Sequence, residues 1–331
     1  MNKIDVLAAI SPQMRAVLAR EDELAASANE TTDDFRLMRE NYERSRAPWV
    51  EGGPVMADTL DIEVPGPAGT VPVRLYYPTE EAAAARAAGT ASTPAIVYAH
   101  GGGFVLGGIG THDRICRLLA ARSGVAVASV DYRLSPEARF PSAVREVAAV
   151  ASFLNRMGAA FGVDGQRLAF AGDSGGAHLS LAATLYLRDQ AGSSAFVRCL
   201  LLYYGWFGLF DSASMRLLGG PWDGLSEDDW AYYLRMYAND PAELRTSPYA
   251  NLLAADLSHG VPPCYIAAAE LDPLRDDSAA LATMLANCGV ERRHVVFEGV
   301  LHAFLHYTKM LDAANEAIEQ GAEFARRQLA C

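Results

Sequence analysis

The chain has 331 residues, of which 51% are hydrophobic and 21% charged, a composition typical of globular proteins and unlike that of disordered or fibrous ones. Its 40 Asp and Glu outnumber its 28 Lys and Arg, and the formal net charge of -12 opposes binding to phosphate backbones and anionic lipids. No run reaches the roughly 18 apolar residues of a membrane span, and charges soon interrupt the N-terminal segment, unlike a secretory leader. We therefore expect a cytoplasmic protein that binds neither nucleic acid nor membranes.

The first third of the chain contains amphipathic helices followed by a strand pair. Residues 5–47 carry apolar side chains at helical spacing among many charges, so we assign residues 1–50 to helices that contribute to a cap. Residues 59–64 and 71–77 alternate between apolar and polar, which predicts two antiparallel strands. The alanine-rich residues 80–93 indicate an exposed helix or loop.

From residue 94 onward, short and continuously apolar segments alternate with amphipathic helices. This pattern predicts an α/β fold with a mostly parallel sheet covered by helices on both faces. In such sheets the chemistry gathers in loops at the carboxyl ends of the strands. The strands that we expect here are residues 95–99, 125–130, 168–171, 200–204, 263–268 and 295–297.

A long insertion interrupts this alternation between Tyr204 and Pro263. We interpret residues 205–255 as a second part of the cap, which divides the core into residues 51–204 and 256–331. Aromatic side chains often only pack a helix pair, and we expect most of these to do so. They are Trp206, Phe207, Phe210, Trp222, Trp230, Tyr232, Tyr233 and Tyr237.

The cysteines give no sign of a disulfide framework or a zinc site. They are odd in number and widely spaced, they contain no C-x-x-C pair, and most have apolar neighbours, so we expect buried free thiols and no bound metal. The five are Cys116, Cys199, Cys264, Cys288 and Cys331.

Ser174 lies in the motif G-x-S-x-G, at residues 172–176, between an expected strand and the helical run of residues 177–188. A tight strand-to-helix turn of this kind lifts the serine oxygen clear of the backbone, and the free amides of the following helix favour negative charge there. The alternative is an ordinary N-cap serine in a glycine-rich helix start. We favour Ser174 as a catalytic nucleophile.

A serine hydroxyl needs a base to remove its proton and an acid to orient that base. His302 follows the last expected strand on a loop at the active edge and is the best-placed base, with His306 one turn into the next helix. These two histidines could instead bind a metal at i, i+4 spacing, but no third ligand accompanies them and the glutamate of H-E-x-x-H is absent.

Asp272 is the favoured acid because it follows a strand and precedes Pro273, which biases it to an extended conformation. Asp276 and Asp277 remain rivals, although aspartates that open a helix commonly serve as caps, and Glu270 is a weaker candidate. The chain order of serine, aspartate and histidine matches that of α/β-hydrolase triads.

The segment His100-Gly101-Gly102-Gly103-Phe104 follows another expected strand and resembles an oxyanion-binding loop. Glycines let backbone amides approach a negatively charged oxygen, and the amide after the nucleophile, that of Gly175, would be a further donor. A dinucleotide-binding loop is the alternative, but Leu106 occupies the position of its third glycine.

These motifs together resemble the bacterial hormone-sensitive-lipase-like esterases over nearly the whole chain. The matching segments are residues 100–104, 131–137, 172–176, 272–277 and 302–304. Residues 111–115, 217–225 and 301–307 further resemble the acetyl esterases of enteric bacteria.

The resemblance implies an eight-stranded α/β-hydrolase fold with a helical cap and hydrolysis of short acyl esters, acetyl to butyryl, without a cofactor. It implies Ser174, Asp272 and His302 as the triad. Gly102, Gly103 and Gly175 would be the oxyanion donors. The sequence departs from the family in having Gly175 where alanine is usual, and in placing His178 in the helix behind it.

Other functions remain open beside this one. The hydrolase scaffold could carry a partner-binding or regulatory role, since a fold does not imply a function. The same chemistry could act on an amide or a sugar acetate. We expect a small-molecule ester substrate, with a homo-oligomer or a regulatory protein partner as further possibilities.

Overall fold

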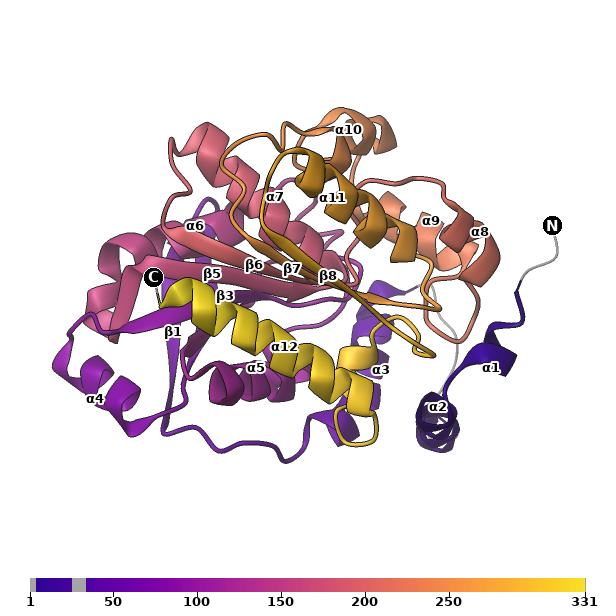
Figure 1. Cartoon of the computed structure of the whole chain (residues 1–331), viewed down its shortest axis with the longest axis horizontal. Coiled ribbons are helices and arrows are strands. Elements are labelled where there is room, and N and C mark those ends of the chain that lie inside the picture. The colour runs from indigo at the N-terminus through magenta and orange to yellow at the C-terminus, as the bar shows by residue number, and fades with distance from the viewer. Residues whose placement is uncertain (1–3, 26–33, 331) are drawn as a thin grey trace.

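An eight-stranded sheet runs through the centre of the molecule in the computed structural model, which describes residues 4–25 and 34–330 (Figure 1). The strand order is β1-β2-β4-β3-β5-β6-β7-β8. β2 pairs antiparallel with both β1 and β4, and the remaining pairs are parallel, which confirms the expected mostly parallel sheet. The strands are β1 (Asp58–Gly66), β2 (Gly69–Tyr77), β3 (Thr93–Ala99), β4 (Ala126–Val130), β5 (Val163–Asp173), β6 (Val197–Tyr203), β7 (Cys264–Ala269) and β8 (Arg292–Phe297).

Helices cover both faces of the sheet, and this explains why the central strands are continuously apolar. Val97 of β3 packs in a cluster with side chains of α6 (Ser142–Met157), α7 (Gly175–Gln190) and α11 (Arg275–Asn287). Ile96 and Tyr98 face the other way, into a cluster with α5 (Ile109–Ser123) and α12 (Asp312–Leu329). Successive residues of a strand point to opposite faces, so residues 95–99 of β3 and residues 168–173 of β5 are all buried.

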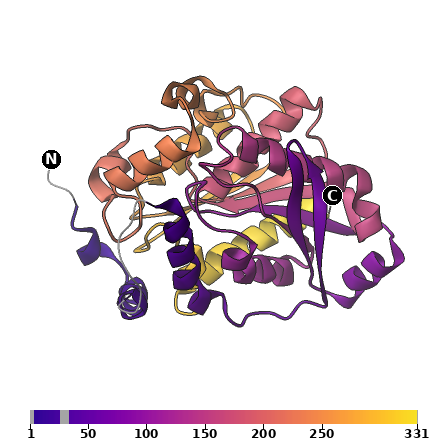
Figure 2. The same ribbon diagram turned by 180° about the vertical axis from the view of Figure 1, so that it is seen from behind.

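The N-terminal helices and the helices of the insertion lie toward the same end of the sheet, as both views show (Figures 1 and 2). Within the described ranges, no helix combines the length and the apolar character that crossing a bilayer requires. The helices at this end are α1 (Val6–Ala9), α2 (Pro12–Ala25), α3 (Phe35–Val50), α8 (Ala213–Leu218), α9 (Glu227–Tyr237) and α10 (Pro241–Thr246).

Several elements begin earlier than the apolar pattern predicts. β5 starts at Val163 rather than at residue 168, β6 at Val197 rather than 200, and β8 at Arg292 rather than 295. These early parts include polar or partly exposed side chains, at residues 164–167 of β5 and residues 292–293 of β8. They lie at the margin of the sheet, where the backbone pairs without burying every side chain. Hydrophobic pattern therefore finds the centre of a strand more reliably than its start.

Local corrections concern the alanine-rich segment and the chain after β8. Residues 80–88 form the helix α4 (Glu80–Ala88), and Ala82 and Ala85 on it are buried rather than exposed. His306 lies in the short 3₁₀ turn η3 (Phe304–Tyr307), and the regular helix begins only at Asp312.

The described cysteines are free thiols, as expected. Cys116, Cys199 and Cys264 are buried in the core, and Cys288 is half-buried. Burial raises the pKa of each of the three core thiols, so they stay protonated and unreactive. Cys331 lies outside the described residues.

Candidate active site

Ser174 occupies a sharp turn between the end of β5 and the start of α7. Its φ of 51° lies in the left-handed region, which a non-glycine residue adopts only when the surrounding structure enforces it. Gly176 is required here because a Cβ at that position would lie 1.9 Å from the carbonyl oxygen of Ala99. The Ser174 side chain does not cap the helix, so the turn presents its hydroxyl elsewhere.

The hydroxyl faces His302, and two hydrogen bonds of this histidine bring all three predicted residues together. His302 Nε2 lies 2.8 Å from Ser174 Oγ, and His302 Nδ1 lies 2.7 Å from Asp272 Oδ2. The second oxygen of Asp272 accepts the N–H of Leu274 at 2.7 Å. Asp272 is fully buried, and the ring of Tyr204 packs edge-on against His302. The carboxylate and the imidazole are therefore both held in place.

The electrostatic environment of His302 favours its protonated form. Burial by itself lowers the pKa of an imidazole, but the Asp272 carboxylate and its hydrogen bond raise it, and the charges of Asp223 and Asp173 add to this effect. The net pKa of His302 is raised above its ordinary value. A histidine in this setting accepts a proton from serine more readily than a free imidazole does.

The rival acids serve other purposes. Asp277 Oδ1 accepts the backbone N–H groups of residues 207–209 at 2.7 to 3.1 Å, and Asp276 Oδ2 accepts the N–H of Ser214 at 2.8 Å. Glu270 Oε2 accepts the N–H of Gly299 at 2.7 Å. The two aspartates thus fix the first residues of the insertion, and Asp272 is the carboxylate bonded to His302.

The glycine-rich loop after β3 lies beside the serine. Gly102, Gly103 and Gly175 all line the same pocket as Ser174. Gly102 and Gly103 have positive φ values of 122° and 58°, and a Cβ on Gly103 would lie 2.5 Å from the ring of Tyr233 on α9. Glycine therefore lets Tyr233 pack directly on the loop backbone, and the loop lines the pocket beside Ser174.

Phe104 explains why a glycine follows the nucleophile. A Cβ on Gly175 would lie 3.2 Å from the edge of the Phe104 ring, closer than ordinary contact. That ring is buried and stacks on Tyr237, with centroids 3.7 Å apart and an angle of 11° between the planes. Phe104 therefore takes the space that an alanine methyl group at position 175 would use.

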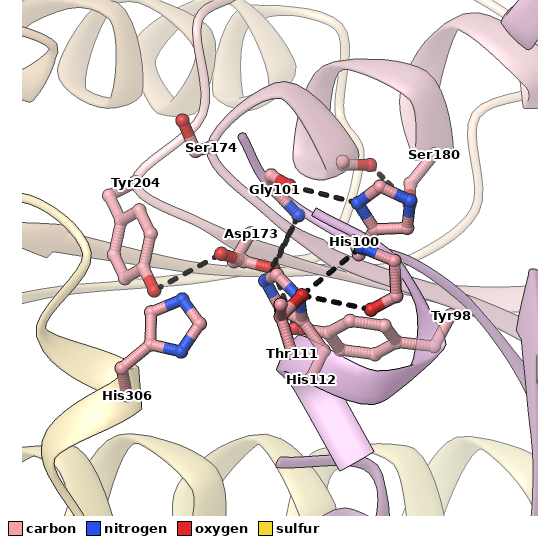
Figure 3. Close-up of polar contacts among 12 residues, drawn as sticks. Tyr98, His100, Gly101, Thr111, His112, Asp173, Ser174, Ser180, Tyr204 and His306 are labelled. Carbon is pink, nitrogen blue, oxygen red and sulfur yellow. Dashed lines mark hydrogen bonds and ion pairs between the residues drawn. The ribbon is translucent and has the colours of Figure 1, made fainter. Parts of the chain in front are cut away.

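A buried polar cluster lies directly beneath the serine, centred on Asp173 (Figure 3). Asp173 Oδ1 accepts the hydroxyl of Tyr98 at 2.7 Å and the N–H of Gly101 at 3.0 Å, and His112 Nε2 lies 3.3 Å away. Burial opposes the charge of Asp173, but the influence of His112 and His306 and the hydrogen bond from Tyr98 outweigh it, and the pKa of the carboxyl is well below its usual range. A charged carboxylate therefore ties the start of the glycine-rich loop to the nucleophile turn.

His306 adjoins this cluster, and its contacts are to His112 and Tyr42 rather than to His302. Its ring packs edge-on against His112 with centroids 4.7 Å apart, and its Nε2 lies 3.3 Å from the hydroxyl of Tyr42 on α3. Potential metal-ligand atoms of His112, Asp173 and His306 lie within 4.8 Å of one another. The Asp173 carboxylate already accepts several hydrogen bonds, so the contacts of this trio are those of a hydrogen-bonded support.

Sequence reasoning missed this support and the polar part of the pocket wall. The only signal for Asp173 in the sequence was its position next to Ser174, and His112 and His306 are distant from it in sequence.

The pocket has a volume of about 320 Å³. Its walls include side chains from α2, α3 and the insertion to which the sequence assigned no individual role, among them Glu21, Arg46, Trp222 and Asp223.

Backbone strain also concentrates at this site. Four non-glycine residues in the described part of the chain have positive φ, and each lies on the pocket or packs against a residue of it. Strained conformations gather where function demands a fixed geometry. The four are Phe104, Ser174, Tyr204 and Ala303.

Comparison with known proteins agrees with this geometry. A family model described as the alpha/beta hydrolase fold matches residues 96–306. An esterase from Pyrobaculum calidifontis is 35% identical, covers 96% of this chain and 98% of its own, and superposes with a TM-score of 0.86. A thermophilic carboxylesterase from a metagenomic library is 32% identical over 89% of this chain and 98% of its own, with a TM-score of 0.83. A thermostable esterase from Pseudomonas putida is 26% identical over 97% and 98%, with a TM-score of 0.86.

Proposed function

The chain belongs to the hormone-sensitive-lipase-like family of α/β-hydrolases, and from this premise we propose that it is a serine carboxylesterase that hydrolyses short-chain acyl esters, acetyl to butyryl. Neighbouring structures named as esterases support ester hydrolysis as the reaction. The observation that carries the proposal is the unbroken chain of hydrogen bonds from Ser174 through His302 to Asp272.

Acylation begins when Ser174 Oγ attacks the ester carbonyl carbon and His302 Nε2 takes the hydroxyl proton. Asp272 holds the Nδ1–H tautomer of the imidazole and stabilises the imidazolium that forms. The carbonyl oxygen becomes an oxyanion, for which the backbone amides of Gly102, Gly103 and Gly175 are the proposed donors. One such donor contributes roughly 3 to 4 kcal/mol of transition-state stabilisation in serine hydrolases.

The tetrahedral intermediate collapses when the alkoxide leaves and receives the proton from His302 Nε2. A water molecule then takes the place of the alcohol, loses a proton to the same nitrogen, and attacks the acyl carbon. Ser174 Oγ recovers its proton from His302 as the carboxylic acid departs. The enzyme ends in its starting protonation state.

The pocket dimensions support a short acyl group. A volume of about 320 Å³ is at the lower end of ligand-binding cavities, roughly 300 to 1,000 Å³. Aromatic side chains form part of its wall, Phe104, Trp206 and Tyr233 among them. A short acyl group fits a cavity of this size.

The decisive experiment compares wild type with Ser174→Ala on p-nitrophenyl acetate. We expect the variant to lose nearly all turnover and to keep its far-UV circular dichroism spectrum, with Ser193→Ala on an exposed loop as the matched control. A fluorophosphonate should label wild type once per chain and leave Ser174→Ala unlabelled. Undiminished turnover by Ser174→Ala would refute the assignment of the nucleophile.

The acyl preference needs a separate measurement. We expect kcat/KM for p-nitrophenyl esters to be highest between acetyl and butyryl and to fall for octanoyl and decanoyl. A maximum at decanoyl would contradict the short-chain proposal while leaving the hydrolase chemistry intact.

A further inference from the structure

A second cavity, with a volume of about 630 Å³, adjoins the candidate active-site pocket of about 320 Å³. Among the described residues, four line both cavities: Leu225, Trp230, Leu234 and Leu274. Because the same residues border both spaces, they form the partition between them. All four side chains are apolar, so the boundary between the two cavities is apolar as well.

The partition is built from the insertion and from the loop of the catalytic acid. Trp230 and Leu234 lie one turn apart on α9 and therefore share a face of that helix. Leu274 is buried, and its N–H donates to Asp272 at 2.7 Å. One end of the partition is thus only two residues away from the carboxylate that holds His302, so the second cavity begins close to the reaction centre.

Trp230 is the largest side chain of the partition, and it joins an aromatic cluster that extends from one cavity to the other. Its ring packs edge-on against Trp206, with centroids 5.3 Å apart and an angle of 78°. Trp206 lines the catalytic pocket, and its Nε1 is anchored by a 2.9 Å hydrogen bond to the carbonyl oxygen of Leu209. Trp206 also packs edge-on against Phe210, which lines the second cavity. Truncating Trp230 would therefore open the partition more than any other single change.

The chemistry of the second cavity selects an alkyl chain. Its charged lining residues are all exposed, so they lie at its solvent side, and the boundary with the catalytic pocket is formed by the apolar partition. A polar group that crossed the partition would lose its hydration without gaining a partner there, whereas a hydrocarbon chain has no such cost. The charged residues are Asp211, Arg216, Glu227 and Arg245.

We propose that Trp230 determines the chain-length specificity of the enzyme, because its indole closes the catalytic pocket against the second cavity and excludes esters whose unbranched alkyl chain would extend past the partition. This inference rests on the proposed short-chain ester hydrolysis at Ser174 and names the residue that imposes the limit. The chain has the same chemistry in the acyl half and in the alcohol half of an ester, and the test has an arm for each half.

The test compares wild type with Trp230→Ala on a long and a short ester in each arm. The acyl arm uses p-nitrophenyl octanoate and butyrate, and the alcohol arm uses n-hexyl acetate and ethyl acetate. We expect the long-to-short ratio of kcat/KM to rise about tenfold or more in at least one arm, because each methylene that gains an apolar site adds to the discrimination. Leu234→Ala, a smaller truncation of the same partition, should raise the same ratio to a lesser extent.

Two variants separate use of the second cavity from a general loosening of the insertion. Met215 lines the second cavity and is not part of the partition, so Met215→Ala enlarges that cavity and should leave the ratio at the wild-type value. Ala231 also lines only the second cavity of the two. In the double variant Trp230→Ala/Ala231→Trp, a new indole occupies part of this space, and most of the gain should disappear.

Unchanged ratios in both arms for Trp230→Ala and Leu234→Ala would overturn the proposal. A gain that persists in the double variant, or an equal gain in Met215→Ala, would overturn it as well. These results are distinct from failure of the esterase proposal, in which wild type would not hydrolyse p-nitrophenyl acetate at all. They are also distinct from failure of the short-chain proposal, which the acyl profile of wild type alone would reveal.

Discussion

The side chain of Ser174 is placed by its backbone rather than by its own packing. A φ of 51° costs a non-glycine residue about 1–3 kcal/mol, and the flanking strand and helix supply the packing that offsets it. In return, Oγ lies at hydrogen-bond distance from His302 before any substrate binds. The reacting atoms therefore need little rearrangement at the start of acylation.

The pH dependence of activity should follow His302. Since its pKa is raised and only the neutral ring can accept the serine proton, activity should fall with decreasing pH through a value above the ordinary pKa of about 6.5. In Asp272→Asn the raising influence of the carboxylate is gone while the lowering by burial stays. We expect the acid limb to move to lower pH and the plateau kcat to fall by on the order of 10⁴-fold.

Profiles of kcat/KM for p-nitrophenyl acetate between pH 5 and about 9 would test this. Asp276→Asn is the comparison, because Asp276 bonds to the backbone of Ser214 instead of to His302. An acid limb that stays in place in Asp272→Asn, or a larger loss in Asp276→Asn, would contradict the assignment of the acid.

Gly175→Ala should disturb the oxyanion site through Phe104. The backbone at this position has no positive φ, so alanine fits the helix start, but its methyl group would press on a ring that is already stacked on Tyr237. We expect kcat to fall several-fold with little change in melting temperature, because the strain is offset by the lower chain entropy of alanine in the unfolded state. Adding Phe104→Leu, which removes the ring edge, should restore part of the kcat. No recovery in the double variant would mean that Phe104 is not the obstacle.

At the scale of elements, β3, β5 and the loop between β3 and α5 meet at Asp173. The Tyr98 hydroxyl donates to this carboxylate from β3, whereas the Tyr203 hydroxyl on β6 is buried without a partner in the described chain. Tyr98→Phe should lower the free energy of unfolding by about 1.5–3 kcal/mol, the usual contribution of a hydrogen bond to a charged group. It should also lower kcat, because Asp173 holds Gly101 at the base of the glycine-rich loop.

Urea denaturation of Tyr98→Phe and Tyr203→Phe side by side would check this prediction. Tyr203→Phe should be neutral or slightly stabilising, since it removes a buried hydroxyl that has no partner. Equal losses of stability in the two variants would indicate that the hydroxyl of Tyr98 contributes nothing specific.

The strand centres and the grouping of Ser174, His302 and Asp272 could be predicted from sequence because each rests on local signals. Apolar segments marked the strand centres, G-x-S-x-G marked the turn, and strand ends located Asp272 and His302. The support at Asp173 could not be predicted, because its partners Tyr98, His112 and His306 come from three separate segments that only the tertiary fold brings together. The margins of β5 and β8 were missed for a related reason, since backbone pairing there does not depend on apolar side chains.

At the scale of the whole molecule, the N-terminal helices stabilise the active site from outside the sheet. Arg39 of α3 donates to the carbonyl oxygens of Val105 and Ser135 at 2.8 and 2.9 Å and pairs with Glu137. Val105 belongs to the same loop as Gly102 and Gly103. This helix therefore acts on the loop that we propose as the oxyanion site.

Arg39→Ala should lower kcat/KM about tenfold and destabilise the protein by about 1–3 kcal/mol, because two carbonyl groups and a carboxylate lose their donor. Arg44→Ala on the same helix is the control, since Arg44 is exposed and, among the described residues, its guanidinium donates a hydrogen bond to Asn41. Steady-state kinetics and thermal unfolding of both variants would show whether Arg39 supports the glycine-rich loop. If Arg39→Ala behaved like Arg44→Ala, α3 would have no part in holding the loop.

The hydrogen bond between Ser174 and His302 joins residues that are 128 positions apart in the chain, with β6, β7 and β8 folded between them. Closing so long a loop costs entropy before any contact compensates it, so such pairs form late in folding. Helices can regain their circular dichroism signal while β8 is still undocked, but the base cannot reach the serine until the last strand has paired. During refolding, recovered ester hydrolysis should therefore report that β6, β7 and β8 have docked beside β5.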